Sequence, residues 1–102
     1  MADEPELMAL HLKIQGRVQR VYYRQWLVGE ATARGVRGWV RNRADGSVEA
    51  VLSGEMSAVR ALVQACHQGP PKAKVERVIQ IPGEYRPTED DFPEEFRQLP
   101  TL

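Results

Sequence analysis

The hydrophobic pattern of this chain switches repeatedly between two periods, and the order of the switches limits the folds that it can adopt. Alternating apolar residues predict strands over about 10–15, 36–40, 48–52 and 74–81. Helical spacing predicts helices over about 21–34 and 59–67, and a short fifth strand is expected at 96–99. The order is therefore βαββαβ before that last strand. Two helices with one apolar face each can cover one side of an antiparallel sheet, which predicts an α+β fold, a ferredoxin-like two-layer α/β sandwich.

The length of 102 residues fits one small domain. We expect residues 1–7 to be a disordered N-terminal tail and residues 8–102 to form the domain. Arg77 breaks the alternation of the fourth strand, which indicates either a bulge or a charged strand end. The segment 83–95 holds six acidic residues and two prolines, so we expect it to be a solvated loop.

Composition and charge exclude several classes of function. The 14 basic and 14 acidic residues cancel, so no basic excess indicates a nucleic-acid partner. No apolar stretch is long enough to span a bilayer, so we expect no membrane partner. One cysteine and an acidic start without signal-peptide features predict a cytoplasmic protein. No spacing typical of metal ligands is present, so we expect neither a metal nor another cofactor.

Residues 16–24 join the first strand to the first helix through a turn that begins with glycine and carries three arginines. Backbone N–H groups in such a turn, with those of the helix's first turn, form a concave surface that suits a phosphate-like anion. Arg24 stands at its mouth, where a guanidinium can hold two oxygens at once. The residues alone leave two interpretations open: an anion site, or a solvated loop in which Arg24 lies near Glu30.

A second segment, Gly38-Trp39-Val40-Arg41-Asn42, precedes the turn Asp45-Gly46 and the strand Val48-Glu49-Ala50. Together the two segments resemble the acylphosphatase family, which has a G-x-V-Q-G-V-x-[FY]-R loop and then G-W-V-x-N, a D-G turn and V-E-A. The matching residues of the loop are Gly16, Val18, Gln19, Val21, Tyr23 and Arg24. Gly69-Pro70, Val75 and Val78 fall where the family has a helix end and its fourth strand, so the resemblance covers about residues 8–99.

The resemblance implies the same fold and an enzyme, an acylphosphatase, that hydrolyses the carboxyl-phosphate bond of small acyl phosphates by in-line attack of water. It implies that Arg24 and the backbone N–H groups of Gln19, Arg20, Val21, Tyr22 and Tyr23 hold the phosphate, and that Asn42 orients the water. The departing carboxylate has a conjugate acid of ordinary carboxyl pKa, so the reaction requires no general acid. We expect the enzyme to act on a small molecule as a monomer.

One departure from the motif leaves an alternative open. Arg20 stands where the family has its second loop glycine, so the chain could be a non-catalytic phosphate or acyl-phosphate binding module of the same fold. Asn42 could also cap the turn at 43–44 instead of serving a site.

An RNA-recognition motif is disfavoured, because the strands at 10–15 and 47–52 hold no aromatic residue on which bases could stack. We expect Cys66 to be a core residue, and Tyr22 and Tyr23 to pack at the helix start, one outward and one inward.

Overall fold

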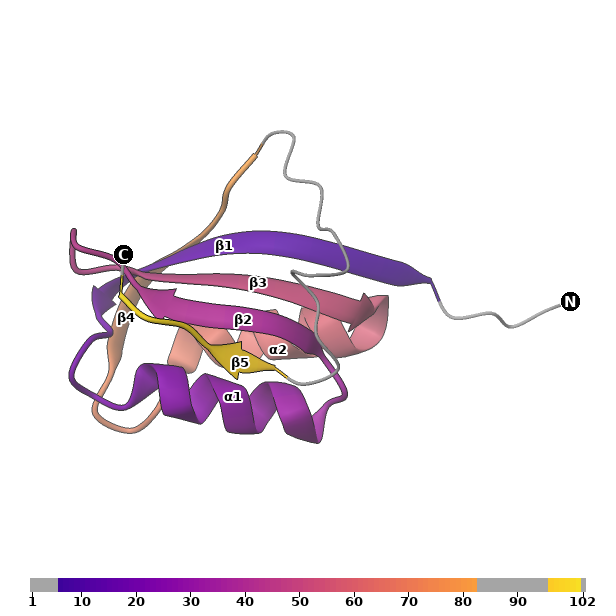
Figure 1. The fold of residues 1–102 in the computed structure, drawn as a ribbon, viewed down its shortest axis with the longest axis horizontal. Coiled ribbons are helices and arrows are strands. Elements are labelled where there is room, and N and C mark those ends of the chain that lie inside the picture. The colour runs from indigo at the N-terminus through magenta and orange to yellow at the C-terminus, as the bar shows by residue number, and fades with distance from the viewer. Residues whose placement is uncertain (1–5, 83–95, 102) are drawn as a thin grey trace, which may run out of the picture.

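The computed structural model describes residues 6–82 and 96–101, which form five strands and two helices (Figure 1). In chain order they are β1 (Leu7–Arg17), α1 (Tyr23–Ala33), β2 (Arg37–Asn42), β3 (Val48–Glu55), α2 (Met56–Gln68), β4 (Lys74–Gln80) and β5 (Arg97–Gln98). The predicted order and the α+β ferredoxin-like fold class are confirmed. The expectations for residues 1–5 and for the acidic segment 83–95 lie outside the described residues.

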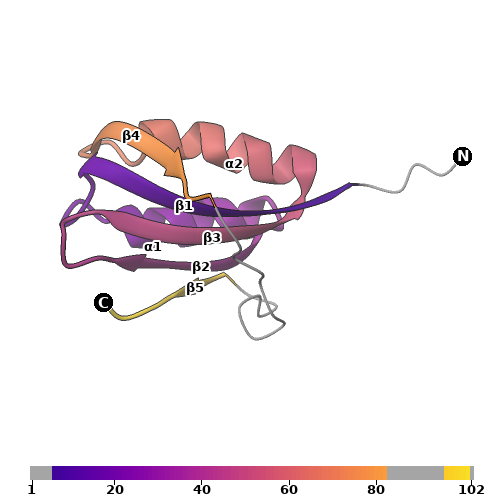
Figure 2. The same ribbon diagram turned by 90° about the horizontal axis from the view of Figure 1, so that it is seen from above.

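The strands form one sheet in the order β4-β1-β3-β2-β5. The first three pairings are antiparallel, but β5 lies beside β2 and runs parallel to it (Figure 2). The sheet is therefore mixed, and the prediction of a purely antiparallel sheet is wrong in this respect. The physical reason is that β4 and β5 lie at opposite edges of the sheet, so β5 does not pair with β4, the strand that precedes it in the chain. Its direction is set by its pairing with β2.

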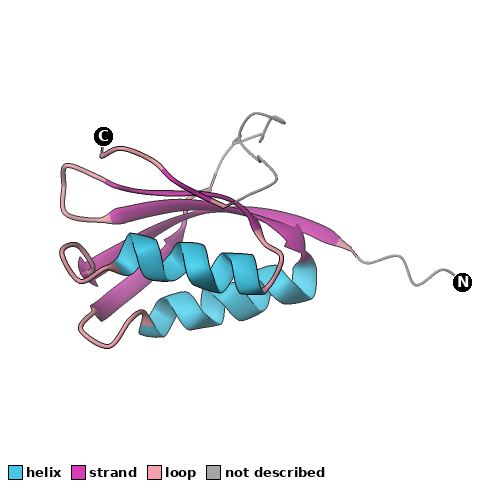
Figure 3. Cartoon of the chain, turned by 60° about the horizontal axis from the view of Figure 1, so that its bottom comes forward, coloured by secondary structure: helices cyan, strands magenta, loops and turns pink. Residues whose placement is uncertain are grey.

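Both helices pack on the same face of the sheet (Figure 3). Tyr23, Leu27 and Ala31 form the buried stripe of α1, and Val59, Leu62 and Cys66 form that of α2. These stripes meet the inward side chains of the strands in one core, which confirms the predicted place of Cys66. Burial raises the pKa of the Cys66 thiol to about 11, so this cysteine is not a nucleophile near neutral pH. No helix in the part of the chain that the structure describes is long and apolar enough to cross a membrane.

The strand β4 contains the irregularity that Arg77 indicated. Gln15 is paired with Arg77 but the next residue, Gly16, is paired with Val75, so Glu76 is the extra residue of a bulge. Gly16 has a φ of 123°, and a side chain at this position would overlap the backbone of Lys74. Glycine is therefore required where β1 passes into the following loop.

The sheet face opposite the helices carries a buried carboxylate, Glu49 on β3. Its Oε1 accepts hydrogen bonds from Arg41 Nε at 2.8 Å and Arg43 Nη1 at 3.1 Å, and its Oε2 lies 2.5 Å from His11 Nε2. The Arg41 guanidinium also lies 4.8 Å from the centre of the Trp39 ring. Burial alone would raise the pKa of Glu49, but the hydrogen bonds and charges of Arg41 and His11 outweigh it and lower this pKa.

Glutamine at position 49 is expected to destabilise the protein at pH 7, because His11, Arg41 and Arg43 would lose their carboxylate. We expect a loss of about 2 kcal/mol, or roughly 10 °C in Tm. Since folding lowers the pKa of Glu49, its stabilisation is present above the ordinary carboxyl pKa of 4.5 and is lost as the pH falls through the folded-state value. Thermal unfolding of both proteins between pH 7 and pH 3 measures this: the difference in Tm should shrink on acidification.

The exposed Glu55 at the end of β3 offers a matched control, because Glu55→Gln removes a carboxylate for which no ion pair with another described residue is seen. Glu55 is also the N-cap residue of α2, where its charge interacts only weakly with the helix dipole, so the Tm of Glu55→Gln should stay within a few degrees of the wild type across the whole pH range. Equal Tm values for Glu49→Gln and the wild type at pH 7 would contradict the stabilising role of Glu49.

Candidate active site

The loop between β1 and α1 has an unusual backbone. Arg20 and Tyr22 both adopt left-handed conformations, with φ values of 62° and 63°. The first helical hydrogen bond follows at once, from Trp26 N to Tyr22 O at 2.9 Å. Within residues 6–82 and 96–101, no backbone hydrogen bond is donated by the N–H groups of 19–22. The loop and the first turn of α1 therefore present unpaired N–H groups in a bend, the arrangement that binds anions.

Each end of this loop is held by a side chain. At its start, Gln19 Nε2 donates to the carbonyl oxygens of Arg43 and Ser47, both at 2.8 Å. At its end, the buried Tyr23 hydroxyl donates to Cys66 O at 2.8 Å, at the last turn of α2. Burial raises the pKa of Tyr23, so its phenol stays protonated as this donor. The expected packing at the helix start is confirmed, because Tyr23 is 1% exposed and Tyr22 is 74% exposed.

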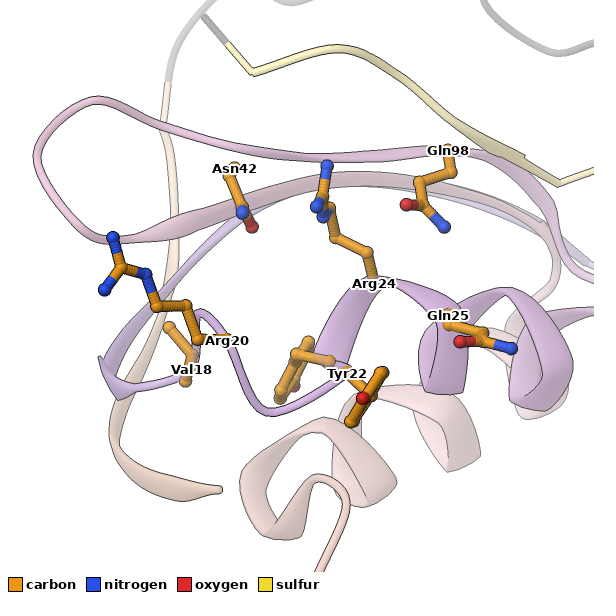
Figure 4. A pocket seen from close by; sticks show the side chains of 8 residues that line it. Val18, Arg20, Tyr22, Arg24, Gln25, Asn42 and Gln98 are labelled. Atoms are coloured by element: carbon orange, nitrogen blue, oxygen red, sulfur yellow. The ribbon is translucent and has the colours of Figure 1, made fainter. Parts of the chain in front are cut away.

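The loop borders a pocket of about 310 Å³. Its lining residues come from the loop, the first turn of α1, the end of β2 and β5: Val18, Arg20, Tyr22, Tyr23, Arg24, Gln25, Asn42 and Gln98 (Figure 4). The Arg24 side chain extends from the helix toward the strands, with Asn42 to one side of it and Gln98 to the other (Figure 4). The pocket therefore has a cation between Asn42 and Gln98.

Asn42 is the last residue of β2, and its buried Oδ1 has no hydrogen-bond partner among the residues that the structure describes. Leaving such an oxygen unpaired costs about 1 to 3 kcal/mol, and an unpaired buried polar atom at a pocket wall is what a site for water or ligand requires. The turn-capping interpretation of Asn42 does not hold, because Asp45 Oδ1 caps that turn, accepting from Ser47 N at 2.9 Å and Ser47 Oγ at 2.6 Å.

Arg24 makes no ion pair within the described parts of the chain. The acidic neighbour considered from the sequence, Glu30, is instead paired with Arg34 at 3.1 Å. The guanidinium of Arg24 therefore lies half-buried beside the pocket with its donors available to an anion.

The structure brings most of the predicted site residues together. Arg20, Tyr22, Tyr23, Arg24 and Asn42 line the pocket. The side chains of the other two do not: Gln19 is bonded to the β2–β3 turn, and Val21 belongs to the hydrophobic core. Sequence reasoning did not assign three residues that line the pocket, Val18, Gln25 and Gln98. For Gln25 the signal was its position directly after Arg24 in the first turn of the helix, whereas for Gln98 there was none.

Comparisons with known proteins identify the family of this chain. The sequence model of the acylphosphatase family matches residues 10–93. An acylphosphatase of Acidovorax sp. is 53% identical over 78 residues, which are 76% of this chain and 80% of the relative. An acylphosphatase of Pyrobaculum arsenaticum is 47% identical over 98 residues, 95% of this chain and 99% of the relative. The crystal structure of acylphosphatase from Bacillus subtilis has a TM-score of 0.79 and 33% identity, covering 92% of this chain and 99% of that one. The chain belongs to the acylphosphatase family.

Proposed function

We propose that this acylphosphatase hydrolyses small acyl phosphates by in-line attack of water, with the phosphoryl group held by Arg24 and the loop and the water oriented by Asn42. The observation that carries this proposal is a pair of groups in one pocket that have no partner among the described residues: the buried Asn42 Oδ1 lacks a hydrogen bond, and Arg24 lacks an ion pair. An amide both donates and accepts, so Asn42 can hold a water with a lone pair directed at phosphorus.

The order of the side chains along the pocket is compatible with the in-line geometry (Figure 4). The attacking water and the departing carboxylate must lie on opposite sides of phosphorus. If the phosphoryl group rests at Arg24, with its water on the Asn42 side, the acyl group extends toward Gln25 and Gln98 (Figure 4). Arg24 and the loop N–H groups would then neutralise the phosphoryl oxygens, and the carboxylate departs without help from an acid.

The non-catalytic alternative is not favoured. It rested on the concern that Arg20 would distort the loop, but Arg20 adopts the left-handed conformation that a glycine would take there. The relatives matched along the chain are acylphosphatases. We therefore propose an active enzyme, acting as a monomer in the cytoplasm. Light scattering of the purified protein tests the oligomeric state.

Turnover of a small aryl acyl phosphate such as benzoyl phosphate is the direct test of the function. We expect release of inorganic phosphate and benzoate well above the buffer rate. We also expect the rate to be unchanged by EDTA, because Arg24 and backbone N–H groups supply the positive charge in the proposed mechanism. Phosphate binding without turnover would replace the enzyme by a binding module, and loss of activity in EDTA would contradict the metal-free mechanism.

Arg20→Gly is expected to raise Tm and to keep kcat/KM at or above the wild-type value, because glycine takes the existing left-handed conformation of the loop without strain. A left-handed backbone costs a residue other than glycine about 1 to 2 kcal/mol in the folded state. Glycine avoids this cost, but its greater flexibility in the unfolded chain lowers the stability by about 0.4 to 1 kcal/mol, which offsets part of the gain. The Arg20 side chain extends away from Arg24, so its loss removes no guanidinium from the proposed phosphate position (Figure 4). Steady-state kinetics and thermal unfolding of Arg20→Gly measure both effects, and the gain in Tm should be a few degrees, at roughly 4 to 8 °C per kcal/mol.

The variant Arg20→Ala separates charge from backbone strain, since alanine removes the guanidinium but keeps the unfavourable φ. Its Tm should therefore not rise. If kcat/KM instead falls in both variants, the arginine assists phosphate binding and the strain argument is wrong.

A further inference from the structure

The side chain of Gln19 links two parts of the site that the proposed mechanism treats separately. Both of its hydrogen bonds, to Arg43 O and Ser47 O at 2.8 Å, come from the one amide nitrogen, so both N–H groups of that amide are engaged. Gln19 directly precedes Arg20, the first strained residue of the loop, and Arg43 directly follows Asn42. The link therefore joins the start of the anion-binding loop to the strand end that carries Asn42.

The β2–β3 turn does not need Gln19 in order to close. Arg43 O also accepts from Gly46 N at 3.1 Å, and Ser47 O also accepts from Arg43 N at 2.8 Å. The Asp45 carboxylate adds two hydrogen bonds from Ser47. Each carbonyl that Gln19 contacts thus keeps another donor, and the hairpin remains satisfied if the glutamine amide is removed.

What the two bonds of Gln19 do add is a fixed distance between the loop and β2. Strained conformations such as those of Arg20 and Tyr22 persist where the surrounding structure holds them on both sides. Tyr23 holds the far end of this loop through Cys66 O. Gln19 holds the near end, and it does so against the strand of Asn42.

We propose that Gln19 is a positioning residue, whose side chain sets the register between the phosphate-holding loop and the water-orienting Asn42. The inference rests on the proposed function and adds to it a role for a side chain that does not line the pocket. Catalytic groups must be held to within about 0.5 Å, and a displacement of about 1 Å can cost on the order of a hundredfold in rate. The link should therefore influence kcat more than phosphate affinity, because Arg24 and the loop N–H groups remain present without it.

The test uses Gln19→Met, which keeps the length of the side chain and removes its donors. We expect kcat for benzoyl phosphate to fall on the order of ten- to a hundredfold, with little change in the Kd of inorganic phosphate. In the Asn42→Ala background the same substitution should have a much smaller effect on kcat, because the group that Gln19 positions is gone. The matched control is Gln64→Met, on the exposed side of α2, which should leave kcat unchanged.

A second readout does not depend on turnover. The side-chain amide signals of Asn42, the one asparagine of the chain, should shift or broaden in the NMR spectrum of Gln19→Met and stay in place in Gln64→Met. Equal losses of kcat in the wild-type and Asn42→Ala backgrounds, or unchanged Asn42 signals, would overturn the positioning role. An inactive wild-type protein would refute the proposed function instead, and the Asn42 signals would still decide whether Gln19 fixes the register.

Discussion

Alanine in place of Arg24 is expected to abolish phosphate binding and turnover together. The guanidinium is the cation between Asn42 and Gln98 in the pocket, and it forms no ion pair within the described residues that would already hold it (Figure 4). Arginine side chains that stabilise a transferring phosphoryl group contribute about 10³ to 10⁵ in rate. We therefore expect kcat/KM to fall at least about a thousandfold. Calorimetric titration with inorganic phosphate should detect no binding.

Two further variants make the Arg24 result specific. Arg24→Lys keeps the charge but loses the planar pair of donors, so it should retain weak phosphate binding and a small part of the activity. Arg17→Ala removes an exposed arginine at the end of β1 that does not line the pocket, and it should behave like the wild type. Unaltered phosphate affinity in Arg24→Ala would remove this residue from the site.

Alanine in place of Asn42 should give a different result, a large loss of kcat with phosphate affinity mostly retained. Asn42 is proposed to orient the water and not to hold the phosphate, so its amide matters in the transition state. Removal of one preorganised polar group at developing charge costs on the order of 10² to 10³ in kcat. Steady-state kinetics and phosphate titration of the same preparation separate the two parameters, and circular dichroism should show an unchanged fold.

Asn42→Asp is the informative companion of the alanine variant. It has nearly the same shape, but its carboxylate would face the phosphoryl oxygens, so phosphate affinity should fall as well as kcat. Full activity in Asn42→Ala would exclude the assignment of the water to this residue.

The hydrophobic periods predicted the architecture well, because they report which side of each element faces the core. Tyr23, Leu27 and Ala31 are buried on α1 as their spacing predicted. The boundaries were less accurate. The strand β1 begins at Leu7, since Leu7 pairs with Glu55 of β3, whereas the unbroken apolar run Leu7-Met8-Ala9-Leu10 shows no alternation. The helix α1 begins at Tyr23 because Tyr22 is left-handed.

The family and the hydrolase activity were predicted from two ordered motifs, and the comparisons confirm both. The motifs lie in segments adjacent in the fold, so they also predicted that the loop and Asn42 meet at one place. The motifs could not predict that Gln98 lines one side of the pocket. The two-residue strand β5 has no period of its own, and its parallel pairing with β2 depends on a distant part of the sheet.

The unpaired oxygen of Asn42 and the two left-handed residues of the loop have a consequence for how this protein can change. Each of these features opposes folding, so the energy that maintains them comes from the core beneath α1 and α2. Selection for heat resistance alone would therefore favour substitutions at Asn42 and Tyr22, and the variants that it yields would tend to lose catalytic efficiency. At Arg20 glycine relieves the strain without that loss, and any further gain in stability has to come from better core packing and surface charges.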